Sequence, residues 1–265
     1  MSGINTNVMS LNAQRNLSTT AITLSTAMQR LSSGLRVNSA KDDAAGLAIA
    51  ERMDAQTRGM NVSIRNSNDA ISMAQTAEGA LGAISNNLQR MRELAVQGSN
   101  GSNTAADVSS LDQEFQLLKA ENDRIVANTK FNGTAVIAAT TFTFQVGANT
   151  GDQIAIAGNT YTGTSSTLGA STTTANAEIA KLDTDIDAVT TLRATWGASQ
   201  NRFESVIANL RVGAENSAAA HGRIVDADYA QETASLTRAQ VLQQAGTAMV
   251  AQANQAPNGV LALLR

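Results

Sequence analysis

Apolar residues recur at alternating spacings of three and four positions in separate blocks near both ends of this 265-residue chain. Such spacing lines up along one side of an α-helix and predicts helices that pack lengthwise against other helices. The N-terminal blocks are Leu17, Ala21, Leu24, Met28, Leu31, Leu35; then Ala70, Ala74, Ala77, Leu81, Ile84, Leu88, Met91, Ala95; then Val108, Leu111, Phe115, Leu118, Ile125, with Asn122 in an apolar place. The C-terminal blocks are Ile179, Leu182, Ile186, Val189, Trp196, Phe203, Ile207, Leu210, Ala214, with Arg193 and Gln200 as polar faults, and then Leu236, Ala239, Leu242, Ala245, Met249, Ala253.

The composition favours thin helical packing over a thick core. Pro257 is the only proline, so almost nothing interrupts a helix before it, and aromatic residues make up only 3% of the chain. We predict a mainly α fold, in which long antiparallel helices from both chain ends form a coiled-coil-like rod.

Turn and cap residues bound the second and third helices. Glycines in QGSNGSN end a helix predicted over 62–97. Thr104 or Asp107 can cap the next helix, which we expect to end near Asn128.

The middle of the chain changes to a period of two. The stretches TFTFQVG and DQIAIAG, separated by GANTGD, predict a small β-hairpin between residues 131 and 160. The next segment, 159–178, is rich in Gly, Ser and Thr, so we expect a surface loop that cannot bury itself.

The sequence offers no constellation for catalysis or metal binding. The chain has no cysteine and one histidine, His221, which excludes zinc–thiolate sites, a cysteine nucleophile and a two-histidine metalloprotease motif. The acidic cluster Asp183, Asp185 and Asp187 lacks the glycine turn of a calcium loop, and we interpret it as a solvated helix face. We expect no enzyme activity and no cofactor.

Charge and hydropathy exclude two further classes of partner. A net charge of −3 without any basic run argues against nucleic-acid binding. The N-terminus has no basic segment followed by an apolar one, and no run reaches the length of a membrane span, so we expect neither a cleaved signal peptide nor membrane insertion.

The two chain ends require partners. Their stripes are rich in alanine, whose burial offsets little of the roughly 1–2 kcal/mol of backbone entropy lost per ordered residue. We expect ends that are disordered when free and helical when packed among copies of the chain, which assemble as a ring or an open helix. The predicted assembly residues are Leu17, Leu24, Met28, Leu31, Leu35, Leu236, Leu242, Met249, Leu261 and Leu264.

Three stretches resemble bacterial flagellins. They are SSGLRVNSAKDDAAGLAIAERM at 32–53, LQRMRELAVQ at 88–97 with ENDRIVANTKFNG at 121–133, and the whole of 223–265. The resemblance fades in 134–175, which implies a short flagellin without large outer domains. It implies a structural subunit of the helical flagellar filament that serves swimming motility.

The resemblance also implies a division of the chain. Residues 1–45 and 220–265 would be inner-tube helices, 46–175 rod-domain helices with the hairpin and loop, and 176–219 the C-terminal rod-domain helix. The bend near Gly34 and Gly46 would then join tube and rod. Lys41, Asp42 and Asp43, which an enzyme could use for chemistry, would instead be polar locks and caps.

Partners follow from the same resemblance. It implies an extracellular filament exported by the flagellar type III route, a chaperone at the C-terminal segment, and filament cap and hook-associated proteins as neighbours. It further implies recognition by the vertebrate Toll-like receptor for flagellin through Gln89, Arg90, Glu93, Leu94, Gln97 and Glu114. A hook–filament junction protein of the same helical architecture is the alternative, and the match over 223–265 favours the filament subunit.

Overall fold

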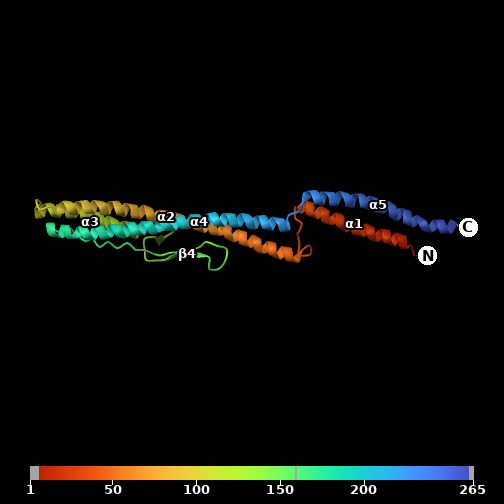
Figure 1. Cartoon of the computed structure of the whole chain (residues 1–265), viewed down its shortest axis with the longest axis horizontal. Coiled ribbons are helices and arrows are strands. Elements are labelled where there is room, and N and C mark those ends of the chain that lie inside the picture. Colours follow the sequence, from red (N-terminus) through yellow and green to blue (C-terminus); the bar gives the residue numbers. More distant parts are fainter. Residues whose placement is uncertain (1–5, 159, 263–265) are drawn as a thin grey trace. The chain divides into compact units, whose positions relative to one another are not determined.

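The chain is mainly helical in the computed structural model, which describes residues 6–158 and 160–262, with side chains up to residue 255 at the C-terminal end. The elements in order are α1 (Val8–Ser33), α2 (Ala44–Gly98), α3 (Ala105–Asn128), β1 (Lys130–Phe131), β2 (Thr134–Ala135), β3 (Phe142–Gln145), β4 (Gln153–Ile156), α4 (Thr172–Val225) and α5 (Tyr229–Ala262) (Figure 1). The predicted fold, with long helices from both chain ends and a small β region between them, is confirmed. The chain forms two compact units: unit 1 is 1–55 with 216–265, and unit 2 is 56–215.

Local sequence signals account for the ends of α1 and α3. Gly34 adopts the left-handed conformation at φ 72° and its N–H donates to the Arg30 carbonyl, which ends α1. Thr104 and Asp107 form a reciprocal capping box at the start of α3, and the helix ends at Asn128 as predicted. Hydrogen bonds from Thr104 lower the pKa of the Asp107 carboxyl.

The non-helical segments 34–43 and 226–228 of unit 1 pair with each other. Leu35 and Asp226 form an isolated antiparallel bridge. The Arg36 N–H donates to the Val225 carbonyl at 2.7 Å, and the Ala227 N–H donates to the Gly34 carbonyl at 2.9 Å. The backbone groups freed where α1 and α4 end are therefore satisfied by each other.

Carboxylates in the first of these segments act as caps. Asp42 Oδ2 accepts hydrogen bonds from the Asn38 N–H and from the N–H and hydroxyl of Ser39, and these bonds lower the pKa of Asp42. Asp43 Oδ1 accepts from the Gly46 N–H at 2.8 Å and caps α2, which therefore begins well before the predicted 62. Lys41, predicted as a further lock, is exposed.

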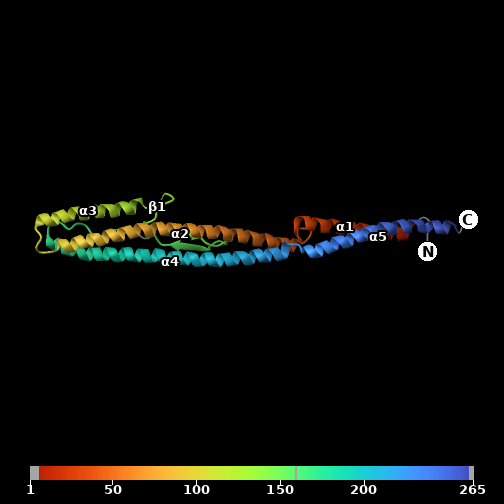
Figure 2. The same ribbon diagram turned by 90° about the horizontal axis from the view of Figure 1, so that it is seen from above.

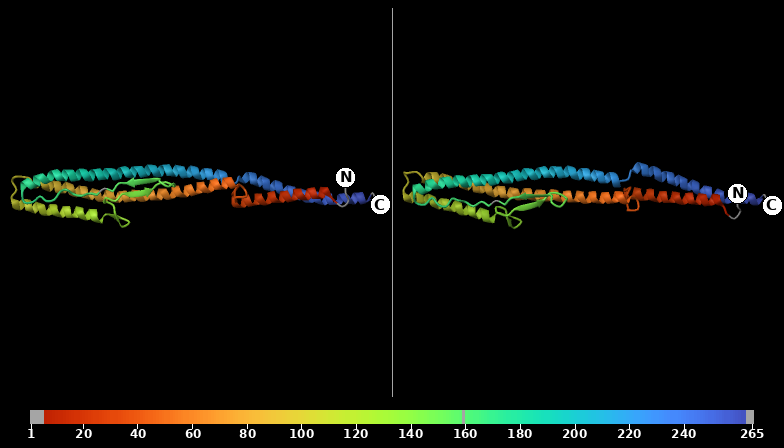
Figure 3. Two further views of the ribbon diagram at one scale, coloured as in Figure 1. Left: turned by 90° about the horizontal axis from the view of Figure 1, so that it is seen from below. Right: turned by 60° about the horizontal axis from the view of Figure 1, so that its bottom comes forward.

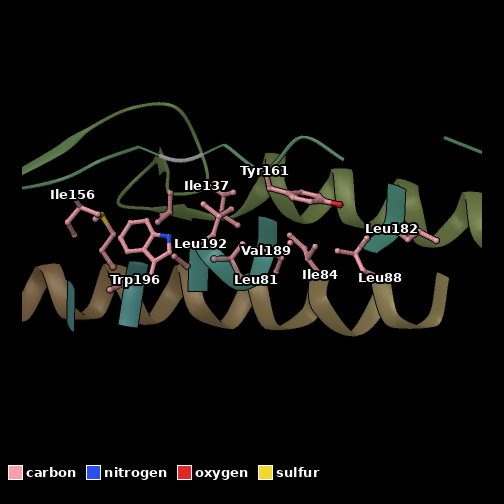
Figure 4. Close-up of a cluster of buried hydrophobic side chains, with 14 of the residues drawn as sticks. Leu81, Ile84, Leu88, Ile137, Ile156, Tyr161, Leu182, Val189, Leu192 and Trp196 are labelled. Carbon is pink, nitrogen blue, oxygen red and sulfur yellow. The ribbon is translucent and has the colours of Figure 1, made fainter. Parts of the chain in front are cut away.

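Unit 2 is built on α3 and the adjoining parts of α2 and α4, which lie lengthwise beside one another (Figures 1 and 2). The predicted stripe on α2 is fully buried from Ala70 to Ala95, and it meets the stripe of α4 in one hydrophobic core. Figure 4 shows this core, with Leu81, Ile84 and Leu88 among the side chains drawn. Burial of these stripes is the main stabilising contribution to unit 2.

Two polar faults in the stripes have partners across helices. Asn122 of α3 is buried and accepts a hydrogen bond from Asn87 Nδ2 of α2 at 2.8 Å. Arg193 of α4 donates from Nε to Glu78 Oε1 of α2 at 2.9 Å. Because each polar group needs its partner opposite, both pairs help to fix how the helices are aligned.

The predicted hairpin is confirmed, and it lies over the core. Strands β3 and β4 pair antiparallel, with Phe142 opposite Ile156 and Gln145 opposite Gln153. Phe144 meets Phe203 of α4 edge to face, with ring centroids 5.6 Å apart. A second short hairpin, β1–β2, precedes it and turns at Asn132-Gly133, where both φ angles are positive. The Asn-Gly pair is the local signal that could have predicted it.

The expectation for 159–178 is wrong in two respects. Tyr161, Ser165 and Leu168 are buried rather than in a loop without buried residues, and α4 already begins at Thr172. The segment packs because acidic side chains of α3 and α4 accept its backbone hydrogen bonds, a long-range arrangement that its own composition does not reveal. We call residues 160–171 the strap.

Candidate assembly surface

Helices α1 and α5 of unit 1 pack antiparallel along their length, as Figure 3 shows. Asn7 Nδ2 donates to the Ala253 carbonyl at 2.7 Å near one end of the pair. Arg30 and Glu232 form an ion pair of 2.9 Å near the other. The Tyr229 hydroxyl donates to the Leu31 carbonyl at 3.1 Å, which satisfies a group in the last turn of α1.

The side chains that are buried between the two helices are small, and half-buried leucines such as Leu17 lie beside them. Those that are buried there are Ser10, Ala27, Ala239 and Ala253. A Cβ atom on Gly246 would come within 3.0 Å of Leu17 Cδ1, so this glycine lets the helices approach closely. Burial of such small groups removes little apolar surface from water, so these buried residues contribute little to the packing of α1 against α5.

Large apolar side chains on the same two helices face solvent instead. They are Val8, Met9, Leu11, Ile22, Met28, Tyr229, Val241, Leu242 and Met249, and we call this set the exposed apolar set. Scattered single residues of this kind are normal, but a helix pair that presents so many of them indicates an interaction surface.

Charged side chains are few on these two helices: besides Arg30 and Glu232, they are the exposed Arg15 and Arg238. Glu232 is the only acidic residue in the sequence of α1 and α5, and it is already paired with Arg30. Few ionised groups would therefore lose hydration if the surface were covered by another chain.

The predicted assembly residues divide into three groups. Leu17, Leu24, Leu31, Leu35 and Leu236 are half-buried, while Met28, Leu242 and Met249 are exposed. The stripe pattern places Leu35 on a helix, but this prediction is wrong, because α1 ends at Ser33 and Leu35 lies in the bridge with Asp226. The Leu261 side chain and Leu264 lie outside the described residues. The stripe pattern missed Ile22 and Val241, because it follows one face of each helix and these lie off it.

A second surface gathers most of the predicted receptor-binding residues on α2 and α3. Arg90 Nε donates to Glu114 Oε1 at 2.9 Å, and Arg90 also pairs with Glu93 at 3.0 Å. These two carboxylates raise the pKa of the Arg90 guanidinium, Glu114 most. Gln89 and Gln97 are also exposed on α2.

Leu94 does not belong to that surface. The structure contradicts its prediction as an apolar receptor contact, because its side chain is fully buried in the core of unit 2. Its position three residues after Met91 continues the buried side of α2, and this periodicity could have excluded it.

The acidic cluster on α4 is not a uniformly solvated face. Asp183 and Asp187 are exposed, but Asp185 is buried and accepts hydrogen bonds from Thr164 and Ser165 of the strap. In the described ranges 6–158 and 160–262, no three His, Cys, Asp or Glu residues are grouped so that they could hold a metal ion. None of the helices in the described part of the chain has the length and apolarity that a membrane crossing requires.

Comparisons with known proteins agree along the whole chain. The family model "Bacterial flagellin N-terminal helical region" matches residues 4–141, and "Bacterial flagellin C-terminal helical region" matches 179–264. A flagellin of Halalkalibacterium halodurans is 46% identical over 270 residues, which cover 99% of each chain. A flagellin of Xenorhabdus nematophila is 41% identical over 309 residues, again 99% of each. The crystal structure of Bacillus cereus flagellin is similar with a TM-score of 0.52 at 39% identity, over 55% of this chain and 88% of that one.

Proposed function

This chain belongs to the bacterial flagellin family and is a structural subunit of the extracellular flagellar filament, and we propose that it polymerises through unit 1. The alternative of a hook–filament junction protein is not favoured, because the relatives that match over the full length are flagellins.

The exposed apolar set is the observation that carries this proposal. It lies on a helix pair whose buried seam residues are alanine and serine and whose leucines are only half-buried, so much apolar surface is left for a neighbouring copy to cover. When each copy contacts the next through two different faces, the same contact can repeat along the assembly. If the rotation that relates one copy to the next does not close a ring, the result is an open helical filament.

The proposal extends to the division of the chain. Residues 1–45 and 220–265 would form the inner tube of the filament, and 46–175 with 176–219 its outer rod domain. Coupled folding of the ends with assembly remains a prediction, since the structure gives α1 and α5 as helices. Export without a cleaved signal, a chaperone at the C-terminal segment, and contacts with cap and hook-associated proteins belong to the same proposal.

Seeded polymerisation tests it. Full-length chain and a chain lacking 1–45 and 220–265 would be added to sonicated filament seeds and measured by sedimentation and electron microscopy. We expect pelletable filaments from the full-length chain alone. Equal polymerisation of the truncated chain would contradict the proposal, provided that circular dichroism shows its unit 2 to be folded.

A second proposal concerns the vertebrate Toll-like receptor for flagellin. We infer that the receptor-binding surface consists of Gln89, Arg90, Glu93, Gln97 and Glu114. Ion pairs hold the Arg90 guanidinium beside the carboxylates of Glu93 and Glu114 at the exposed surface, where a receptor can contact all three. Substitution Arg90→Ala should weaken receptor activation in a reporter cell assay, and Arg124→Ala, an exposed arginine elsewhere on unit 2, should not. Equal effects of the two substitutions would contradict this assignment.

A further inference from the structure

The strap of unit 2 is held by its backbone. Thr164 and Ser165 donate their N–H groups to the Asp185 carboxylate at 2.8 and 3.0 Å, and the Ser166 N–H donates to Glu178. The Leu168 N–H donates to Asp112 Oδ1 at 2.7 Å. Glu178 and Asp185 belong to α4, whereas Asp112 belongs to α3, so the middle of the strap, 164–168, is bound to both helices. Gln116 of α3 also donates to the Ser166 carbonyl at 2.8 Å, and Thr174 of α4 donates to the Leu168 carbonyl at 2.6 Å.

The strap in turn supplies hydrogen bonds to the two buried carboxylates on α4. Asp185 is 1% exposed and Glu178 is 2% exposed. Glu178 also forms an ion pair with the Lys181 ammonium at 2.9 Å. Asp185 accepts its hydrogen bonds from the N–H and hydroxyl of Thr164 and from the N–H of Ser165. A buried carboxylate without such donors would be strongly unfavourable, so these contacts form together.

Few side chains of the strap are both apolar and buried. Leu168 is fully buried and lies beside the end of α2, where a Cβ on Gly98 would be 3.9 Å from Leu168 Cδ1. Tyr161 is buried at the other end. A segment held mainly by hydrogen bonds, with few buried apolar side chains, opens at a lower free energy than the helices beneath it.

We propose that the strap is a latch between α3 and α4: Asp112 and Asp185 hold it from the two helices, and its opening frees the α3 turn around Asp112 from α4, while the buried contacts of α3 with α2 persist. This device goes beyond the filament function, because it concerns unit 2 and does not depend on how copies assemble.

Hydrogen exchange on the full-length monomer tests the latch. Asp185→Asn and Asp112→Asn would each replace one carboxylate acceptor, singly and together, and Asp187→Asn would be the control on the exposed side of the same helix. If the strap joins α3 to α4, either single substitution should raise exchange about tenfold or more at Thr164, at Leu168 and in the α3 turn around Asp112. The double substitution should then add little to the larger single effect, because the latch is already open.

Exchange changes limited to the residues that contact each substituted carboxylate would overturn the proposal. If Asp185→Asn affects only Thr164 and Ser165, and Asp112→Asn affects only Leu168, the two anchors are independent and the latch is refuted. Should a carboxylate variant fail to fold, Thr164→Val and Thr167→Val remove the hydroxyl donors to Asp185 and Asp112 and keep both carboxylates, although Thr167→Val also removes the acceptor of the Gly169 N–H. The same comparison then decides: coupled exchange in α3 supports the latch, and unchanged exchange in α3 overturns it.

Discussion

Leu242 and Met249 offer the sharpest test of assembly through unit 1. Both lie on α5, and their exposed fractions are 51% and 62%. Full burial of such a side chain stabilises by about 1.5–3 kcal/mol, so burial of the exposed part between copies contributes roughly 1 kcal/mol for each residue. Substitution of both by alanine keeps a strong helix former at each position and should remove about 2 kcal/mol from each subunit contact.

The assay is the critical concentration for seeded filament growth. A loss of about 2 kcal/mol corresponds to a rise of roughly thirtyfold, because every 1.4 kcal/mol changes an equilibrium constant tenfold. Leu117→Ala is the matched control, since this leucine is 73% exposed on α3 of unit 2. Circular dichroism of each monomer separates lost assembly from lost folding. An unchanged critical concentration for the double variant, with a rise for Leu117→Ala, would refute the reasoning.

Three further predictions follow from single contacts. Gly34→Ala should lower the free energy of unfolding of unit 1 by about 1 kcal/mol in thermal denaturation, because alanine is strained at φ 72°, and an equal loss from Gly101→Ala would contradict this. Asn122→Ala should lower the free energy of unfolding by about 1–3 kcal/mol in urea, since the Asn87 amide loses its acceptor, and a loss below that of the exposed Asn68→Ala would count against it. The depressed pKa of Asp107 means that its capping contribution is present above the usual pKa of 3.8 and is lost as pH falls through the folded-state value. Exchange of the first α3 amides should therefore show an acid step that is absent from Asp107→Asn, and persistence of the step in that variant would exclude the assignment.

Stripes of apolar residues predicted the helices and most of the core, because each side chain reports which side of its own helix is buried. Every member of the series from Ala70 to Ala95 is buried, and even the polar fault at Asn122 lies inside. Caps were predictable for the same reason: Thr104 and Asp107 act within four residues of each other.

Contacts between segments that are distant in the chain could not be predicted from the sequence. Nothing near Asp185 in the chain indicates that the strap will supply its hydrogen bonds, since the donors lie some twenty residues away. The candidate assembly surface was predicted only in part, because the stripes of α1 and α5 combine exposed residues, such as Leu242 and Met249, with half-buried ones, such as Leu17, that pack in the seam between the two helices. Residues such as Ile22 and Val241, which face away from that seam, become visible as a surface only when the two helices are seen together.

A helical reconstruction of the assembled filament by electron cryo-microscopy tests the central claim most directly. The account predicts that α1 and α5 of neighbouring copies form a continuous inner tube, in which Ile22, Leu242 and Met249 are buried between copies. A filament in which these side chains remain in solvent, while unit 2 makes the contacts that hold the copies together, would contradict assembly through unit 1.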